Sequence, residues 1–176
     1  MEKKSLFLVI DWTDWSGKWT QTKILVDKLR QESYDVELAD FPQYGKKSAG
    51  MVEEYLNGKY WTAEEVWPYR ASMFYAADRY DASFQIKKWL AEGKIVVSNR
   101  YVSSNMWHQA GKIKDPIERD KFLNWLEELE YGLFDIPRPD KQILLYMPTE
   151  IWQELVDKKW ARDYVWWEKR DIHESD

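Results

Sequence analysis

Residues 10–22 read Ile-Asp-Trp-Thr-Asp-Trp-Ser-Gly-Lys-Trp-Thr-Gln-Thr, and this stretch decides the expected fold. The apolar run 6–10 precedes it and a helical pattern follows it, so it connects a strand to a helix. Ser16-Gly17-Lys18 at such a junction is the core of a phosphate-binding loop, in which backbone N–H groups and a helix N-terminus converge on phosphate oxygens. The sequence therefore predicts a nucleotide-binding loop over residues 11–20.

Tryptophan occupies three positions of this loop where bare backbone is needed, namely 12, 15 and 19. Glycine allows positive φ angles and a close approach of the backbone to phosphate, because it has no Cβ atom. An indole allows neither of these. The chain as written is therefore expected to bind a nucleotide poorly, although its loop has the framework of a nucleotide site.

Composition and charge restrict the class of protein. The 176 residues are enough for one domain, and the absence of cysteine excludes disulfides and thiolate metal sites. No apolar run approaches the roughly 20 residues that span a bilayer, and no secretory signal precedes the first strand. A net charge of −5 gives no general attraction for nucleic acid or anionic membranes. We expect a cytoplasmic protein with neither of these as a partner.

Strand and helix patterns alternate along the chain. Strands are expected at 6–11, 36–41, 94–99 and 142–147, and helices at 20–31, 48–56, 68–93, 116–133 and 150–158. In the helix at 116–133 one apolar stripe is predicted, made of Phe122, Leu126, Leu129 and Leu133. This alternation is typical of an α/β protein with a central parallel sheet flanked by helices.

The pattern VIDxTDxSGKxTQTK over residues 9–23 resembles the P-loop of the thymidylate kinase family, with tryptophan at the positions marked x at 12, 15 and 19. Four further segments resemble family motifs in the right order: 40–45, 75–79, 99–105 and 136–140. The resemblance implies a three-layer P-loop kinase fold in a single domain, 1–176. Within it, 40–109 would bind dTMP and 158–176 would form a lid-like segment.

The resemblance also assigns an ATP side to the site. Lys18 would hold the β- and γ-phosphate oxygens, within the loop that Ser16 and Gly17 form. Thr20 would lie near phosphate and Mg²⁺, and Asp14 near the sugar hydroxyl and the metal. The lid-like segment would bring two catalytic cations, Arg162 and Arg170.

On the dTMP side, the resemblance implies that Arg100 binds the phosphate and that Tyr75 stacks on thymine. Phe41 and Tyr44 would close the pocket. The base edge would be read by Arg79, Asn105 and Gln109. Taken singly, Tyr75 is more typical of a helix core, and Arg79 of a solvated or salt-bridged helix face.

The implied reaction is phosphoryl transfer from ATP to dTMP, giving ADP and dTDP with the help of Mg²⁺. Members of this family are commonly dimeric, so a homodimer is also expected. Two alternatives remain open. One is another nucleoside monophosphate kinase or a deoxynucleoside kinase, and the other is a catalytically inactive, tryptophan-rich binding protein.

The sequence departs from the family at two places. Asn99 stands where the family usually has aspartate before Arg100, which removes a negative charge near the metal and phosphates. The chain also ends at Asp176, where the family continues with a helix, a strand and a C-terminal helix. The C-terminal part of the fold is therefore expected to be missing.

Tryptophan is abnormally frequent and glycine rare, with 12 and 7 residues. Trp89 and Trp125 lie in amphipathic helices, whereas most of the other ten fall where the resembled family carries glycine. These ten are Trp12, Trp15, Trp19, Trp61, Trp67, Trp107, Trp152, Trp160, Trp166 and Trp167. UGA encodes glycine in some genetic codes and tryptophan in others. We therefore hypothesise that a gene from a lineage that reads UGA as glycine was translated with a table that reads UGA as tryptophan. UGG codons at the loop positions would exclude this.

Overall fold

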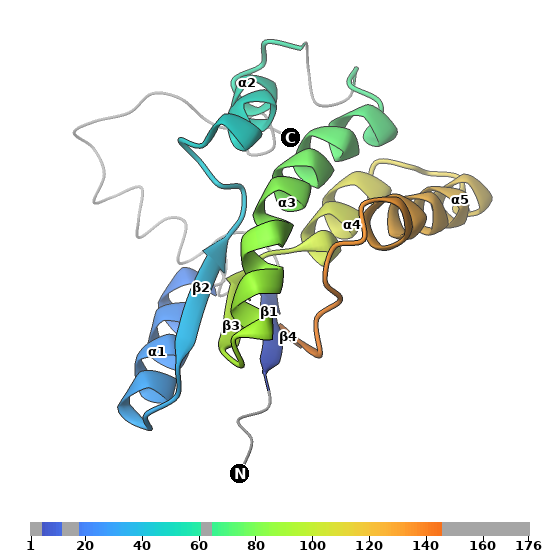
Figure 1. The fold of residues 1–176 in the computed structure, drawn as a ribbon. Coiled ribbons are helices and arrows are strands. Elements are labelled where there is room, and N and C mark those ends of the chain that lie inside the picture. The colour runs from blue at the N-terminus through green and yellow to red at the C-terminus, as the bar shows by residue number, and fades with distance from the viewer. Residues whose placement is uncertain (1–4, 12–17, 61–64, 146–176) are drawn as a thin grey trace, which may run out of the picture.

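A single parallel sheet forms the centre of the computed structural model, which describes residues 5–11, 18–60 and 65–145 (Figure 1). Its strands are β1 (Leu6–Asp11), β2 (Val36–Asp40), β3 (Ile95–Asn99) and β4 (Lys141–Leu144). They are ordered β2-β3-β1-β4, and every neighbouring pair is parallel. The predicted α/β class and its parallel sheet are confirmed.

Helices connect the strands, and all of the described ones except α4 lie where the apolar patterns predict a helix. They are α1 (Lys18–Gln31), α2 (Gly50–Leu56), α3 (Pro68–Ala91), α4 (Val102–Ala110) and α5 (Pro116–Glu127), with a 3₁₀ turn at Lys47–Ala49. The helix expected at 68–93 is one unbroken α3. The expected helix at 150–158, the lid-like segment and the end of the chain lie outside the described residues. None of the described helices is long and apolar enough to cross a membrane.

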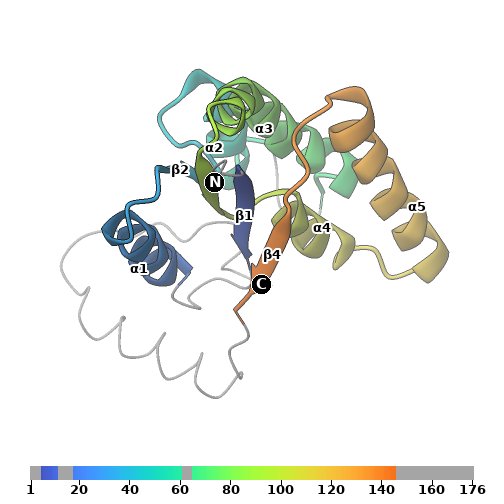
Figure 2. The ribbon, with the colours of Figure 1, turned by 60° about the horizontal axis from the view of Figure 1, so that its bottom comes forward.

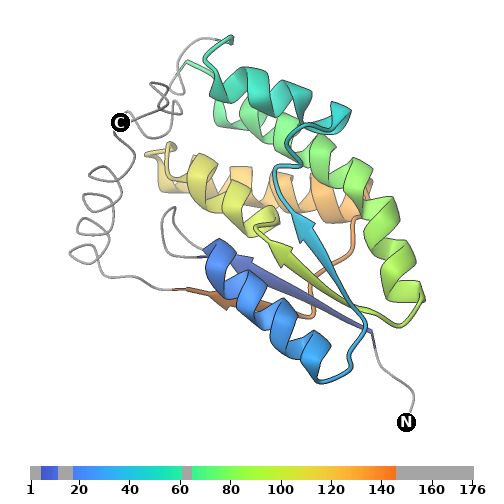
Figure 3. The same cartoon turned by 90° about the vertical axis from the view of Figure 1, so that its left-hand side faces the viewer.

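Successive residues of the strands serve two separate cores. Phe7 and Val9 of β1 pack on one face of the sheet with side chains from α3, α4 and the segment after α5. Leu8 and Ile10 point to the opposite face, where Val26 of α1 covers them. Figures 2 and 3 show the resulting three layers, with α1 on one side of the sheet and α3, α4 and α5 on the other. Burial on both faces explains why the two central strands, β1 and β3, are apolar over most of their length.

One expected helix changes its character before its end. The α-helical pattern at 116–133 becomes a π-helical segment at Glu128–Leu133. The wider turn rotates the following side chains relative to the α-helical period. Leu133, predicted on the buried stripe, is 75% exposed, whereas Glu130 is fully buried. The stripe holds for Phe122, Leu126 and Leu129, and the prediction for Leu133 is wrong.

Candidate active site

A cavity of about 220 Å³ opens at the carboxyl ends of β2 and β3. Parallel α/β sheets commonly bind ligands at this edge, because the strand-to-helix connections meet there. The ends of these strands, the loop after β2, and helices α2, α3 and α4 all contribute to its wall. The lining residues are Asp40, Phe41, Pro42, Tyr44, Leu56, Tyr75, Arg79, Asn99, Arg100, Tyr101, Ser104, Asn105, His108 and Gln109.

Seven of the residues predicted to bind the nucleotide acceptor line this one cavity. They are Phe41, Tyr44, Tyr75, Arg79, Arg100, Asn105 and Gln109. The predicted loop residues Asp14, Ser16 and Gly17 and the lid arginines Arg162 and Arg170 lie outside the described residues. Lys18 and Thr20 belong to the first turn of α1, where Thr20 is exposed. The structure thus juxtaposes the predicted acceptor residues and does not test the predicted ATP residues within 12–17.

Arg100 occupies the turn between β3 and α4 with a φ of +64°, a backbone conformation that is unusual for a residue other than glycine. Its N–H donates to the carbonyl oxygen of Ile10, which joins the ends of β3 and β1. Its guanidinium Nη1 lies 3.4 Å from His108 Nε2. This backbone turn carries the cation to the cavity wall.

Asn99 ends β3 and donates from Nδ2 to Asp40 Oδ1 at the end of β2, at 2.7 Å. Burial raises the pKa of Asp40, and the hydrogen bond from Asn99 lowers it part of the way back. An aspartate at position 99 would place a second carboxylate against Asp40. The amide therefore avoids a repulsive pair and supplies a donor, which gives a physical reason for the departure from the expected aspartate.

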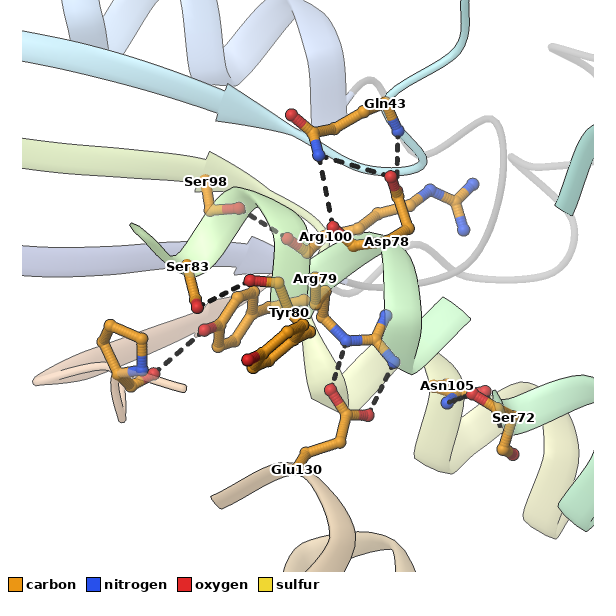
Figure 4. A network of polar contacts seen from close by, with 12 residues as sticks. Gln43, Ser72, Asp78, Arg79, Tyr80, Ser83, Ser98, Arg100, Asn105 and Glu130 are labelled. Carbon is orange, nitrogen blue, oxygen red and sulfur yellow. Dashed lines mark hydrogen bonds and ion pairs between the residues drawn. The ribbon is translucent and has the colours of Figure 1, made fainter. Parts of the chain in front are cut away.

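Arg79 of α3 is buried and forms a two-point ion pair with Glu130, which no sequence pattern predicted. Nε donates to Oε2 at 2.5 Å and Nη2 to Oε1 at 2.6 Å (Figure 4). Burial opposes the charge on Arg79, but the charge and hydrogen bonds of Glu130 outweigh this and raise the pKa of Arg79 above its usual value. The guanidinium stays charged at the cavity wall.

Two amides of α4 complete the polar wall. Asn105 is committed to Ser72 of α3, accepting from its hydroxyl at 3.3 Å and donating to its carbonyl oxygen at 3.4 Å (Figure 4). Gln109 is 1% exposed, and neither its Nε2 nor its Oε1 has a hydrogen-bond partner among the described residues. Buried amides are normally hydrogen-bonded, so Gln109 is available to a polar group of a ligand in the cavity.

The thymidylate kinase family model matches residues 10–175 of this chain. The chain belongs to the thymidylate kinase family. It is 31% identical to a probable thymidylate kinase of Pyrococcus horikoshii over 84% of the chain and 67% of that protein. It is 28% identical to the thymidylate kinase of Mycobacterium tuberculosis over 83% and 68%.

A solved structure of thymidylate kinase from Candida albicans has the same fold, with a TM-score of 0.66 at 23% identity. The alignment covers 92% of this chain and 79% of that one. The chain spans 62% to 68% of the length of the curated relatives it matches. The thymidylate kinase family is one of nucleoside monophosphate kinases, so the chain is a kinase of this class.

Two buried carboxylates support this candidate site, and neither of them was predicted from the sequence for that role. Asp78 accepts from the backbone N–H of Gln43 at 2.8 Å and from the Ser48 hydroxyl at 2.7 Å, which holds the loop bearing Tyr44. Asp11 accepts from the hydroxyl groups of two serines in the first turn of α4. Asp11 ends an apolar strand and belongs to the pattern that resembles the P-loop, but neither signal pointed to the serines of α4.

Proposed function

We propose that this chain transfers the γ-phosphoryl group of ATP to dTMP, giving ADP and dTDP. The observation that carries the proposal is one cavity lined by seven predicted acceptor residues, which come from the loops after β2 and β3 and from α3 and α4. Membership of the thymidylate kinase family supports the same reaction. The proposal therefore rests on the site and on the family together.

Each side chain has a role that its chemistry allows. Arg100 binds the dTMP phosphate through a guanidinium fork, which suits two-point contact with phosphate oxygens. Tyr75 offers a half-buried ring on which a planar base can stack. Arg79 and Gln109 hydrogen-bond the base edge, and Phe41 and Tyr44 close the wall around it. Together these residues hold dTMP with its phosphate at the end of the sheet.

The reaction makes one bond and breaks one. A dTMP phosphate oxygen attacks the γ-phosphorus of ATP, and the bond from that phosphorus to the β–γ bridging oxygen breaks, so ADP leaves with the bond electrons. Catalysis is positioning together with charge neutralisation by Lys18, Arg100 and the lid arginines Arg162 and Arg170. No covalent enzyme intermediate is required.

Mg²⁺ would neutralise phosphate charge when it is bound with ATP. In residues 5–11, 18–60 and 65–145 no group of three or more His, Asp or Glu side chains could hold a metal ion. Mg²⁺ in kinase sites is held by one or two carboxylates together with substrate phosphates and water. We infer that Asp14 and Thr20 supply the protein ligands.

A substrate panel tests the proposal. Release of ADP is measured with dTMP, dUMP, dCMP, dAMP, dGMP and thymidine, using the chain as written and a version with glycine at the ten unusual tryptophan positions. We expect the glycine version to prefer dTMP and the chain as written to be slower, because its indoles obstruct the phosphate loop. Preference for another monophosphate or for thymidine would establish the alternative kinase. Binding of dTMP without turnover by either version would indicate an inactive binding protein.

A further inference from the structure

The ion pair between Arg79 and Glu130 is the most deeply buried charge pair described in the molecule. The side chains are 3% and 0% exposed, and they meet through two parallel hydrogen bonds. Removing two charges from water costs several kcal/mol per ion, and well-packed apolar side chains often do as well or better for stability. The pair therefore needs an explanation other than stability.

The helix that carries Glu130 changes from α-helical to π-helical geometry shortly before this residue. Glu130 lies inside the π-helical segment Glu128–Leu133, whose wider turn buries Glu130 and exposes Leu133. A continuous α-helix would place Leu133 on the apolar stripe of Phe122, Leu126 and Leu129, with Glu130 at the edge of that stripe, four residues after Leu126. Such π-helical turns occur frequently at functional sites.

The geometry divides the donors of Arg79 between the protein core and the cavity. Nε and one N–H of Nη2 are committed to Glu130, and Figure 4 shows Nη1 on the side of the guanidinium away from that carboxylate. In the described part of the chain, Nη1 has no hydrogen-bond partner, although Arg79 lines the cavity. An arginine carries only donors, so this edge can recognise only an acceptor on a ligand.

Gln109 cannot by itself distinguish an acceptor from a donor on a ligand. Its amide offers both a donor and an acceptor, and rotation by 180° exchanges them. It can therefore pair with the imide edge of thymine or with the amino-bearing edge of cytosine. Discrimination between the two bases therefore requires a group that only donates hydrogen bonds and is held in one orientation, as the Arg79 guanidinium is.

We propose that Glu130 is a positioning residue for base selectivity: it holds the Arg79 guanidinium so that the Nη1 edge meets a base carbonyl and rejects an amino group at the same place. This inference rests on the proposed function and assigns to Glu130 a role in the choice of dTMP over dCMP. Glu130 acts through Arg79 and does not contact the nucleotide.

The test is equilibrium titration of dTMP and of dCMP into the full chain and its Glu130→Gln variant. Glutamine is nearly the same size, but its amide presents a donor to one of the two guanidinium N–H groups that the carboxylate accepts. We expect dTMP affinity to fall about tenfold and the preference for dTMP over dCMP to shrink by a similar factor. In turnover, KM for dTMP should rise with little change in kcat.

Asp135→Asn is the matched control, because it removes a carboxylate five residues away that is exposed and paired with Lys87. It should bind both nucleotides like the parent. Thermal unfolding without ligand reports any loss of stability separately. A folded Glu130→Gln variant with lower stability but the parental dTMP-to-dCMP ratio would overturn the proposal, since Glu130 would then be structural alone.

If Glu130→Gln does not fold, Glu130→Asp carries the same test, because it keeps the buried charge but is one methylene too short for both hydrogen bonds. It is expected to show a reduced dTMP-to-dCMP ratio, and an unchanged ratio would overturn the proposal. Failure of the parent chain to bind dTMP at all would instead overturn the proposed function, and with it this inference.

Discussion

Tryptophan side chains fall into two groups in the structure. Trp89 and Trp125 pack against the apolar cores. Trp19, Trp67 and Trp107 are 44%, 53% and 59% exposed. An indole is the largest apolar side chain and is usually well buried. The exposed group contains the described members of the ten unusual positions, and the hypothesis that glycine belongs there stays a prediction.

Arg100 offers the clearest single-residue prediction for the acceptor site. We expect Arg100→Met to lower kcat/KM for dTMP by about 10- to 100-fold, since a hydrogen-bonded charge contact contributes roughly 1.5–3 kcal/mol. The measurement is steady-state kinetics with varied dTMP on a catalytically active form of the chain. Arg70→Met is the control, because Arg70 is an exposed residue of α3 outside the cavity. Equal losses in the two variants would contradict the role of Arg100.

At the level of elements, α4 is attached to the sheet by a buried carboxylate. Asp11, 1% exposed at the end of β1, accepts from the hydroxyls of Ser103 and Ser104, both at 2.5 Å. Negative charge near the first turn of a helix also interacts favourably with the helix dipole. This contact aligns α4, which carries Asn105 and Gln109, with the carboxyl edge of the sheet.

Asp11→Ala is expected to lower the free energy of unfolding by about 2–3 kcal/mol, because two buried hydroxyls lose a charged acceptor. For a chain of this length, that corresponds to a fall of about 4–12 °C in the melting temperature. Thermal and urea unfolding measure it. Asp120→Ala removes an exposed carboxylate from α5 and should change stability little. A similar stability for the two variants would show that the Asp11 contact contributes nothing.

The π-helical segment marks the limit of predicting helices from the spacing of apolar residues. Apolar spacing predicted the helix and its stripe through Leu129, because those positions obey the α-helical period. It could not predict the change of period at Glu128–Leu133. The positive charge that makes burial of the Glu130 carboxylate possible belongs to Arg79, 51 residues earlier in the chain. A charge inside an apolar stripe is the only local sign of such a change.

At the scale of the whole molecule, the acceptor cavity is built from elements other than the two that the predicted phosphate loop joins. The cavity is lined from β2, β3 and the helices α2, α3 and α4, whereas the loop joins β1 to α1. Three of the unusual tryptophans fall in or beside the loop, and none of the cavity-lining residues is tryptophan. Binding of the two substrates should therefore be separable.

We expect dTMP at 100 times its dissociation constant to stabilise the chain as written by about 2.7 kcal/mol, a rise of about 5–11 °C in melting temperature. Mg·ATP should produce a comparable shift only in the version with glycine at the ten positions. Differential scanning fluorimetry of both versions measures this. A strong Mg·ATP shift in the chain as written would refute the steric argument against its loop.

The resemblance predicted seven residues that line the cavity, but not the residues that hold them in place. Tyr75, Arg79, Arg100 and Asn105 could be predicted because they belong to the segments 75–79 and 99–105, which resemble family motifs in order. Support from Asp78, Asp11 and Glu130 could not, because their partners lie 35, 92 and 51 residues away. Local spacing carries no information about such distant contacts.

The sequence by itself determined the family and the alternation of strands and helices, because these follow from local periodicity and short motifs. It also predicted the candidate acceptor residues, seven of which line one cavity. Only the tertiary structure decided that Arg79 is a buried cation held by Glu130, and that Asn99 pairs with Asp40. Both outcomes depend on which side chains meet across different elements, where burial removes water and makes the partner decisive.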